Sequence, residues 1–200
     1  MHTQQRSEET RAQLLEAAEA CFSESGYDAA GVAEICRRAG VSKGAFYHHF
    51  ATKQAIFLEL LVRWLEGLDT QIARARQDAP NVLAALVTIA GMVRQVFKIG
   101  GGRLPIFLAF WMQAARDPEA WVVTIGHYRH YHTLFEAMIA DGIAEGSVAL
   151  TINADAAAQA IVSLGMGLIL QGLLDPEGAD WGRVAEDSIH ILLDGLRNQT

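Results

Sequence analysis

The sequence predicts an all-α protein of about nine helices, with a small three-helix domain over residues 1–52 and a larger helical domain over residues 53–200. Apolar residues recur at the spacing of one helix face almost throughout the chain. Capping residues and glycines separate these runs, and no segment alternates with a period of two. With 51% hydrophobic and 20% charged residues, the composition is that of a globular protein and excludes a disordered or fibrous one.

Three helices are expected at the amino end. The first carries one apolar face, made of Leu14, Ala18, Cys21 and Phe22. It ends near Gly26, and a second helix follows over residues 32–39. Gly40 ends the second helix, and Ser42 can cap a third, which ends at Phe50.

The larger domain begins with a long helix that Thr52 caps. This helix should end by Ala79, because Pro80 disfavours helical geometry in the residue before it. Asn81 caps the next helix, to about residue 97, and Pro105 stands near the start of another that reaches residue 115.

Asp117 and Pro118 open a helix whose apolar stripe also holds a histidine: Trp121, Ile125, Tyr128, His132, Phe135 and Ile139. Asn153 caps a helix to about residue 174 that is apolar on every side. Such a helix must be buried. We therefore expect residues 154–174 and 183–197, the last two helices, to join two chains as a homodimer through a four-helix bundle.

Charge is distributed unevenly along the chain. The formal net charge is −7, yet residues 35–58 contain no acidic residue. The basic and histidine side chains of this window are Arg37, Arg38, Lys43, His48, His49 and Lys53. A local basic window in an acidic protein is either the footprint of a surface that meets phosphates or a run on a solvated face.

Residues 31–50 have the organisation of a helix-turn-helix, in which a tight turn joins two short helices. Its signature residues are Ile35, Ala39, Gly40, Val41, Ser42, Gly44, Tyr47, His49 and Phe50, followed by Lys53. This set closely resembles the DNA-binding signature of the TetR family of bacterial transcriptional regulators. The sequence departs from the family pattern at Gly31, where a Thr or Ser cap is usual, and at Cys36, which replaces a small Ala.

The resemblance implies a homodimer that binds palindromic double-stranded DNA, most simply as a repressor released by a small apolar or amphipathic effector. Lys43 can reach a phosphate or a guanine edge, and Lys53 resembles the family's phosphate-clamping lysine. Arg37 either flanks the DNA backbone or is solvated, and His49 either caps the local fold or touches a phosphate. The expected DNA-binding residues are Arg37, Lys43, Gly44, Ala45, Tyr47, His48, His49 and Lys53.

The larger domain is rich in bulky side chains that either line an effector cavity or form plain core. They are Trp64, Phe107, Phe110, Trp111, Met112, Trp121, Tyr128, Tyr131 and Phe135. Binding cavities for apolar molecules combine such residues with a few polar groups. His132 falls on the apolar stripe beside Tyr128 and Phe135, so it is either a satisfied core histidine or the polar group of the cavity. Gly100, Gly101 and Gly102 form a corner that could gate the cavity.

No metal site and no cofactor are predicted. His127 and His130 have a metal-compatible helical spacing and His132 follows them, but no cysteine or acidic residue adjoins the run. A membrane span is also not expected. The 156–174 segment contains Gln159, Ser163 and Gln171, and its apolar run is shorter than a bilayer needs. The polar start of the chain and the two cysteines favour the cytoplasm.

Three other functions compete with a ligand-released repressor. A redox-responsive regulator would use Cys21 and Cys36, which fall on neighbouring helices. An activator that needs no effector would have the same sequence signature. An enzyme is disfavoured, because no Ser/His/Asp set, HExxH motif or paired carboxylates on one helix face stand out.

Overall fold

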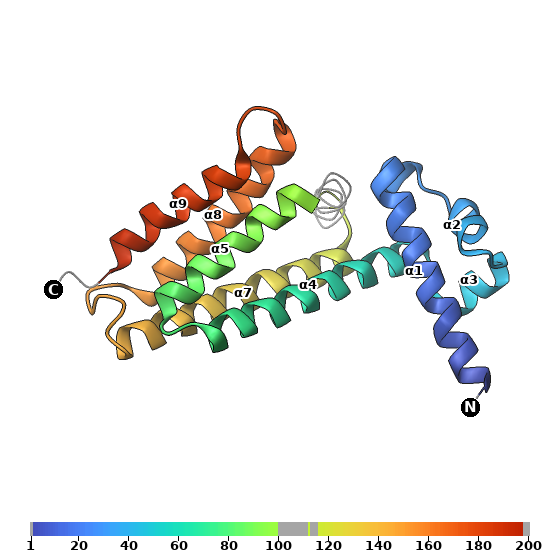
Figure 1. The fold of residues 1–200 in the computed structure, drawn as a ribbon. Helices are drawn as coiled ribbons and strands as arrows, with labels where there is room; N and C mark the ends of the chain where they lie inside the picture. The colour runs from blue at the N-terminus through green and yellow to red at the C-terminus, as the bar shows by residue number, and fades with distance from the viewer. Residues whose placement is uncertain (1, 100–111, 113–115, 198–200) are drawn as a thin grey trace.

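The computed structural model describes residues 2–99, 112 and 116–197. Eight helices and no strand occur within these residues, which confirms the all-α fold (Figure 1). Apart from Met112, the helix predicted over residues 105–115 lies outside the described residues, as do the glycines at 100–102.

Three helices pack together at the amino end: α1 (His2–Ala29), α2 (Val32–Ala39) and α3 (Lys43–His49). Their core contains the four residues predicted for the first helix, all at most 1% exposed, together with Ile35 and Phe46 at 0%. The predicted end of the first helix at Gly26 is a break in helical geometry, because Gly26 has φ 76° and ψ 167°. A short turn then carries the chain to Ala29.

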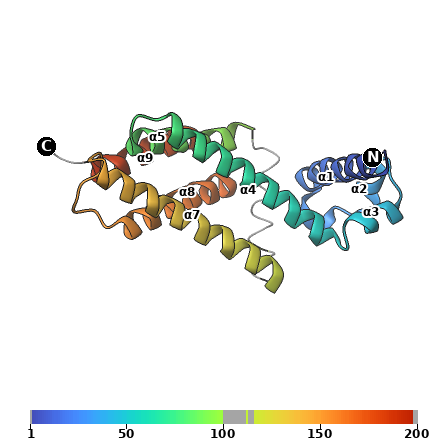
Figure 2. The ribbon, with the colours of Figure 1, turned by 90° about the horizontal axis from the view of Figure 1, so that it is seen from below.

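The helix α4 (Lys53–Asp78) runs from the amino-terminal helices into the rest of the protein (Figures 1 and 2). Thr52 caps it as predicted, since its hydroxyl accepts a hydrogen bond from the Ala55 amide at 3.0 Å. Phe57 and Leu61 of its first half belong to the amino-terminal core, whereas Ile72 belongs to the second core. One helix therefore packs into both hydrophobic cores.

The second core lies among α5 (Val82–Ile99), α7 (Pro118–Ala144), α8 (Ala154–Leu174) and α9 (Trp181–Leu196). Helix α5 packs along α9, and α7 packs along α8. The predicted caps are present: Asn81, Asp117 and Asn153 each accept a hydrogen bond from the amide three residues later, at 2.9, 3.0 and 2.9 Å. These side chains satisfy amides that the first helical turn leaves without partners.

Helices α8 and α9 leave apolar side chains uncovered within one chain. Leu170 and Leu174 of α8 are 46% and 73% exposed, and Ile191 of α9 is 76% exposed. By length and composition alone α8 could cross a membrane, and only 28% of its most apolar window is buried inside the chain. A large part of the apolar surface of α8 and α9 is therefore free to pack against another surface.

Candidate nucleic-acid interface and ligand cavity

The turn between α2 and α3 is fixed by its backbone. Gly40 adopts the left-handed conformation, with φ 67° and ψ 27°, which glycine reaches without the strain of a Cβ. The Val41 amide donates to the Cys36 carbonyl at 3.0 Å, and the Ser42 hydroxyl accepts from the Ala45 amide at 3.1 Å. The orientation of α3 against α2 is therefore built into the turn.

One side of α3 holds it to the core and the other faces solvent. Phe46 is fully buried, whereas Tyr47 is 56% exposed. Lys43 and Tyr47, one helical turn apart, are both exposed, and His48 is exposed beside them. Gly44 keeps the backbone open, since a Cβ built there would meet only the Ser42 hydroxyl, at 3.6 Å. Ala45 and His49 are half-buried.

The surface around residues 35–58 carries less positive charge in the folded protein than the sequence of this window suggests. Arg37 pairs with Glu34 at 2.6 Å, and Arg38 pairs with Glu34 at 2.9 Å and with Glu24 at 2.6 Å. Hydrogen bonds from both arginines lower the pKa of Glu34 to about 2, so that carboxyl is ionised at neutral pH. The charge footprint predicted from residues 35–58 is therefore partly neutralised by Glu34 and Glu24, which precede the window. Lys43 makes no ion pair within the described part of the chain.

Lys53 has a structural partner at the start of α4. Its ammonium donates to the Tyr27 carbonyl oxygen at 2.7 Å and lies 4.3 Å from the centre of the Tyr27 ring. A second polar contact joins α1 to α4, because Arg11 donates two hydrogen bonds of 2.5 Å to the Glu59 carboxylate. The Arg11 guanidinium also lies 5.2 Å from the centre of the Phe50 ring, beside the end of α3. The position of α3 is thus coupled to α4 through these contacts.

A cavity of about 230 Å³ lies between the helices of the second core, α4, α5, α7, α8 and α9. Its α4 and α5 walls are formed by Leu61, Trp64, Leu65, Leu68, Ile72, Leu86, Ile89, Ala90 and Met92. Its remaining walls are formed by Thr124, His127, Tyr128, Tyr131, Phe135, Ile161, Val162, Leu164, Gly165, Met166, Leu168, Ile169, Ala185 and Ile189. The surroundings are those of an apolar binding site.

The few polar groups of the cavity wall are largely engaged with the protein. The Tyr128 hydroxyl donates to the Gln159 side-chain oxygen at 2.9 Å, and the Tyr131 hydroxyl donates to the Leu65 carbonyl at 3.3 Å. The Thr124 hydroxyl donates to a carbonyl of its own helix. Burial lowers the pKa of His127, which favours the neutral imidazole. The wall therefore suits an uncharged, mostly apolar ligand.

The predicted cavity residues divide into three groups. Trp64, Tyr128, Tyr131 and Phe135 line the cavity. Phe107, Phe110 and Trp111 lie outside the described residues.

Trp121, Met112 and His132 do not line it: Trp121 and Met112 are 52% and 54% exposed, and His132 faces Asp155 instead. Trp121 follows the stripe of α7 but lies in the first turns of that helix, beyond the cavity. His127 was missed because its position lies off the predicted apolar stripe.

Two family models cover most of the chain. One describes bacterial regulatory proteins of the tetR family and matches residues 14–60. The other describes the C-terminal part of BetI-type transcriptional repressors and matches residues 89–197. The first contains the whole helix-turn-helix, and the second begins in α5 and ends with α9.

Individual proteins agree over nearly the full length. The transcriptional regulator UidR of Escherichia coli is 23% identical over 91% of this chain and 89% of its own. A crystal structure of a transcriptional regulator from Pseudomonas aeruginosa is 26% identical, covers 92% and 88% of the two chains and has a TM-score of 0.79. A regulator from Saccharomonospora viridis, solved in complex with choline, is 19% identical with a TM-score of 0.82 and covers 96% and 100%. The last comparison concerns the fold alone.

Proposed function

Because the chain belongs to the TetR family of bacterial regulatory proteins, we propose that this transcriptional regulator is a cytoplasmic, homodimeric repressor that a small apolar or amphipathic effector releases from palindromic operator DNA. The observation that carries the proposal is the combination of an exposed α3 with an apolar cavity, joined by the single helix α4. The match to BetI-type repressors over residues 89–197 supports repression rather than activation.

Helix α3 is proposed to enter the major groove. Lys43 and Tyr47 stand one turn apart on its exposed side, where the ammonium can reach a phosphate or a guanine edge and the phenol can reach the backbone. Gly44 and Ala45 allow close approach of the helix to the DNA. Arg37 is half of an ion pair with Glu34, so its contact with phosphate would require that pair to open. His48 and Lys53 are the remaining side chains proposed to face the backbone.

A second copy of the chain is proposed to cover the apolar surface of α8 and α9. Leu170, Leu174 and Ile191 are exposed there in the single chain, and two-fold pairing of these helices makes a four-helix bundle. A dimer of this kind presents two α3 helices to half-sites about 34–36 Å apart.

The effector is proposed to act through α4. Leu61 and Trp64 line the cavity, while Lys53 at the other end of the same helix holds the end of α1. An effector that fits one arrangement of α4 better than another shifts the two populations by its difference in affinity, commonly about 1–3 kcal/mol. Filling the cavity would thereby change the separation of the two α3 helices.

The function is tested by fluorescence anisotropy of a labelled duplex that carries the DNA upstream of the chain's own coding sequence. Affinity should fall steeply between two salt concentrations, because phosphate contacts release counterions. An unlabelled duplex of unrelated sequence is the control, and equal competition by both duplexes would contradict operator recognition.

The redox alternative is disfavoured by the surroundings of the thiols. Cys21 and Cys36 are both buried, and burial raises the pKa of each. Little reactive thiolate is therefore present at neutral pH. A Cys36→Ser variant should respond to oxidant as the natural chain does, and a lost oxidant response would favour the redox function.

A further inference from the structure

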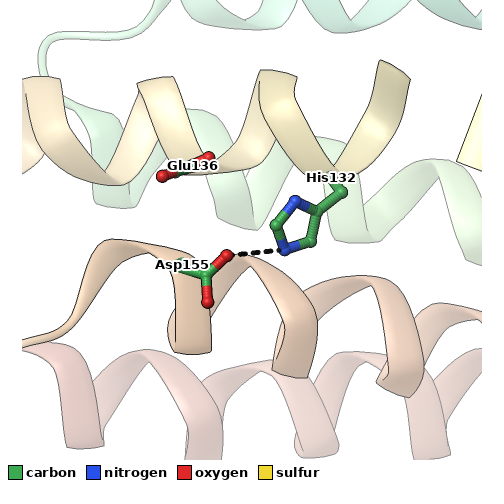
Figure 3. Close-up of side chains that lie close together, drawn as sticks. All are labelled: His132, Glu136 and Asp155. Atoms are coloured by element: carbon green, nitrogen blue, oxygen red, sulfur yellow. Dashed lines mark ion pairs between the residues drawn. The ribbon is translucent and has the colours of Figure 1, made fainter. Parts of the chain in front are cut away.

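A histidine and two carboxylates meet between α7 and α8, outside the cavity. His132, Glu136 and Asp155 each offer one ligand atom, and these three atoms lie within 4.8 Å of one another. The His132 Nε2 atom is 3.3 Å from the Asp155 Oδ1 atom (Figure 3). Along the sequence only histidines stand close to His132, whereas the fold adds Asp155 from α8.

The three side chains are held by different helical turns. His132 and Glu136 come from successive turns of α7, four residues apart, so they project from the same face (Figure 3). Asp155 lies in the first turn of α8, whose start is fixed by the Asn153 cap. The fully buried Ile139 and the nearly buried Phe135 anchor this part of α7 in the core.

The cluster is short of positive charge. Two carboxylates face one imidazole, and no lysine or arginine forms an ion pair with Glu136 or Asp155 in the part of the chain that the structure describes. The His132 side chain is 21% exposed and the Asp155 side chain is 68% exposed, so solvent reaches the cluster from the Asp155 side. A bound cation would balance this charge.

The spacing suits a transition metal. Two ligands about 2.1 Å from a tetrahedral Zn²⁺ ion stand roughly 3.4 Å apart. The His132–Asp155 separation of 3.3 Å already matches this value. All three ligand atoms lie within 4.8 Å of one another, and a rotation of the Glu136 side chain would bring its carboxylate closer to the other two.

We propose that His132, Glu136 and Asp155 bind a divalent first-row transition metal such as Zn²⁺, with water in the remaining coordination positions. An imidazole ligand favours such a metal over Mg²⁺ or Ca²⁺, which prefer oxygen ligands.

The metal would fasten α7 to α8 one turn away from the Tyr128–Gln159 hydrogen bond. Both helices line the cavity, so metal binding would stabilise one arrangement of its wall.

Isothermal titration calorimetry with ZnCl₂ on the full chain, after removal of metal with a chelator, tests the site. The titration should give one ion per chain. Thermal denaturation should show a rise in Tm of roughly 5–10 °C when the Zn²⁺ concentration is a hundredfold above Kd. The variant Glu136→Gln keeps the shape of the side chain but removes a ligand, and it should weaken binding by roughly tenfold or more. Asp155→Asn should do the same, and 10 mM MgCl₂, roughly a cytosolic excess, should give no heat.

The matched control is His130→Gln. His130 stands two residues away on α7 and forms the same kind of pair, with its Nε2 atom 3.3 Å from Asp69, but it is not part of the three-residue cluster. This variant should bind Zn²⁺ as the natural chain does. Absence of Zn²⁺ binding in the natural chain would overturn the proposal. So would a Zn²⁺ affinity in Glu136→Gln and Asp155→Asn equal to that of the natural chain. Loss of binding in His130→Gln alone would place the ion elsewhere and overturn it as well.

Discussion

The ammonium of Lys53 donates a hydrogen bond of 2.7 Å to the carbonyl oxygen of Tyr27 and stands over the ring of the same residue. The first residue of α4 thus holds the last turn of α1. A lysine has three donors, so this contact leaves room for a phosphate. The proposed role of Lys53 in DNA binding and its structural role can be separated by measuring DNA affinity and the free energy of unfolding.

The variant Lys53→Met should lower both stability and DNA affinity. Loss of the hydrogen bond and the ring contact should reduce the free energy of unfolding by about 1 kcal/mol, measured by urea denaturation. Loss of a phosphate contact should reduce the slope of log affinity against log salt by about 0.9.

Lys43→Met is its control, because Lys43 is exposed on α3. It should change the salt slope but not the stability. An unchanged slope in Lys53→Met would remove Lys53 from the DNA contacts.

The variant Gly40→Ala should destabilise the helix-turn-helix. A Cβ at Gly40 meets no atom within 4 Å, so the whole effect arises from the left-handed backbone at φ +67°. This conformation costs a non-glycine residue about 1–2 kcal/mol. Thermal denaturation measures the loss. Gly31→Ala is the control, since Gly31 has an extended backbone with φ −95° and equally open space; because Gly31 is the N-cap residue of α2, we expect a smaller loss there rather than none.

The helices of this protein could be predicted because their ends are local. Ser42, Thr52, Asn81 and Asn153 each accept a hydrogen bond from an amide three residues later, a pattern that the sequence itself contains. Gly40 ends α2 as expected for the same reason.

The electrostatic surface and the cavity could be predicted only in part, because they depend on residues that fold together from distant positions. Arg38 is neutralised partly by Glu24, fourteen residues earlier, which no charge count over a continuous window includes. His132 fell on an apolar stripe and was expected in the cavity, but the packing of α7 on α8 turns it toward Asp155. His127 lies off that stripe and nevertheless lines the cavity, since several helices surround α7 there.

Protonation of His127 should destabilise the protein as the pH falls. Burial lowers its pKa in the folded chain below the ordinary value of 6.5, so below that pH the unfolded chain binds the proton more readily. The stabilising contribution is therefore complete above about pH 6.5 and is lost as the pH falls toward the lower folded pKa. Urea denaturation at several pH values should show a smaller loss of stability between pH 7 and pH 5 in His127→Phe than in the natural chain. Parallel pH profiles for the two proteins would contradict an uncharged His127.

The variant Ile191→Glu should dissociate the proposed dimer. Ile191 is 76% exposed in the single chain, and a carboxylate at this position would be buried without a partner when α9 meets a second copy. Burial of an unpaired charge costs several kcal/mol, so dimerisation should weaken by about 100-fold or more.

Light scattering should then give the monomer mass of 21.8 kDa, where the natural chain gives about twice that value. Leu150→Glu is the control, because Leu150 is 81% exposed but lies in the segment before α8, and this variant should remain dimeric.

The variant Gly165→Leu should close the cavity without unfolding the protein. Gly165 lies on the cavity wall in the middle of α8, and a Cβ built there meets no atom within 4 Å. Replacing a glycine inside a helix also raises helix propensity by about 0.8 kcal/mol.

We therefore expect a Tm at or above that of the natural chain, together with loss of binding of the neutral apolar fluorophore N-phenyl-1-naphthylamine. Gly67→Leu provides the same gain in propensity on the exposed side of α4, away from the cavity, and should still bind the fluorophore. If both variants bind it as the natural chain does, the apolar site lies elsewhere in the molecule. If Gly165→Leu loses both the fluorophore and its response to an effector while keeping its affinity for DNA, then the cavity is the place where ligand binding is converted into a change in DNA binding.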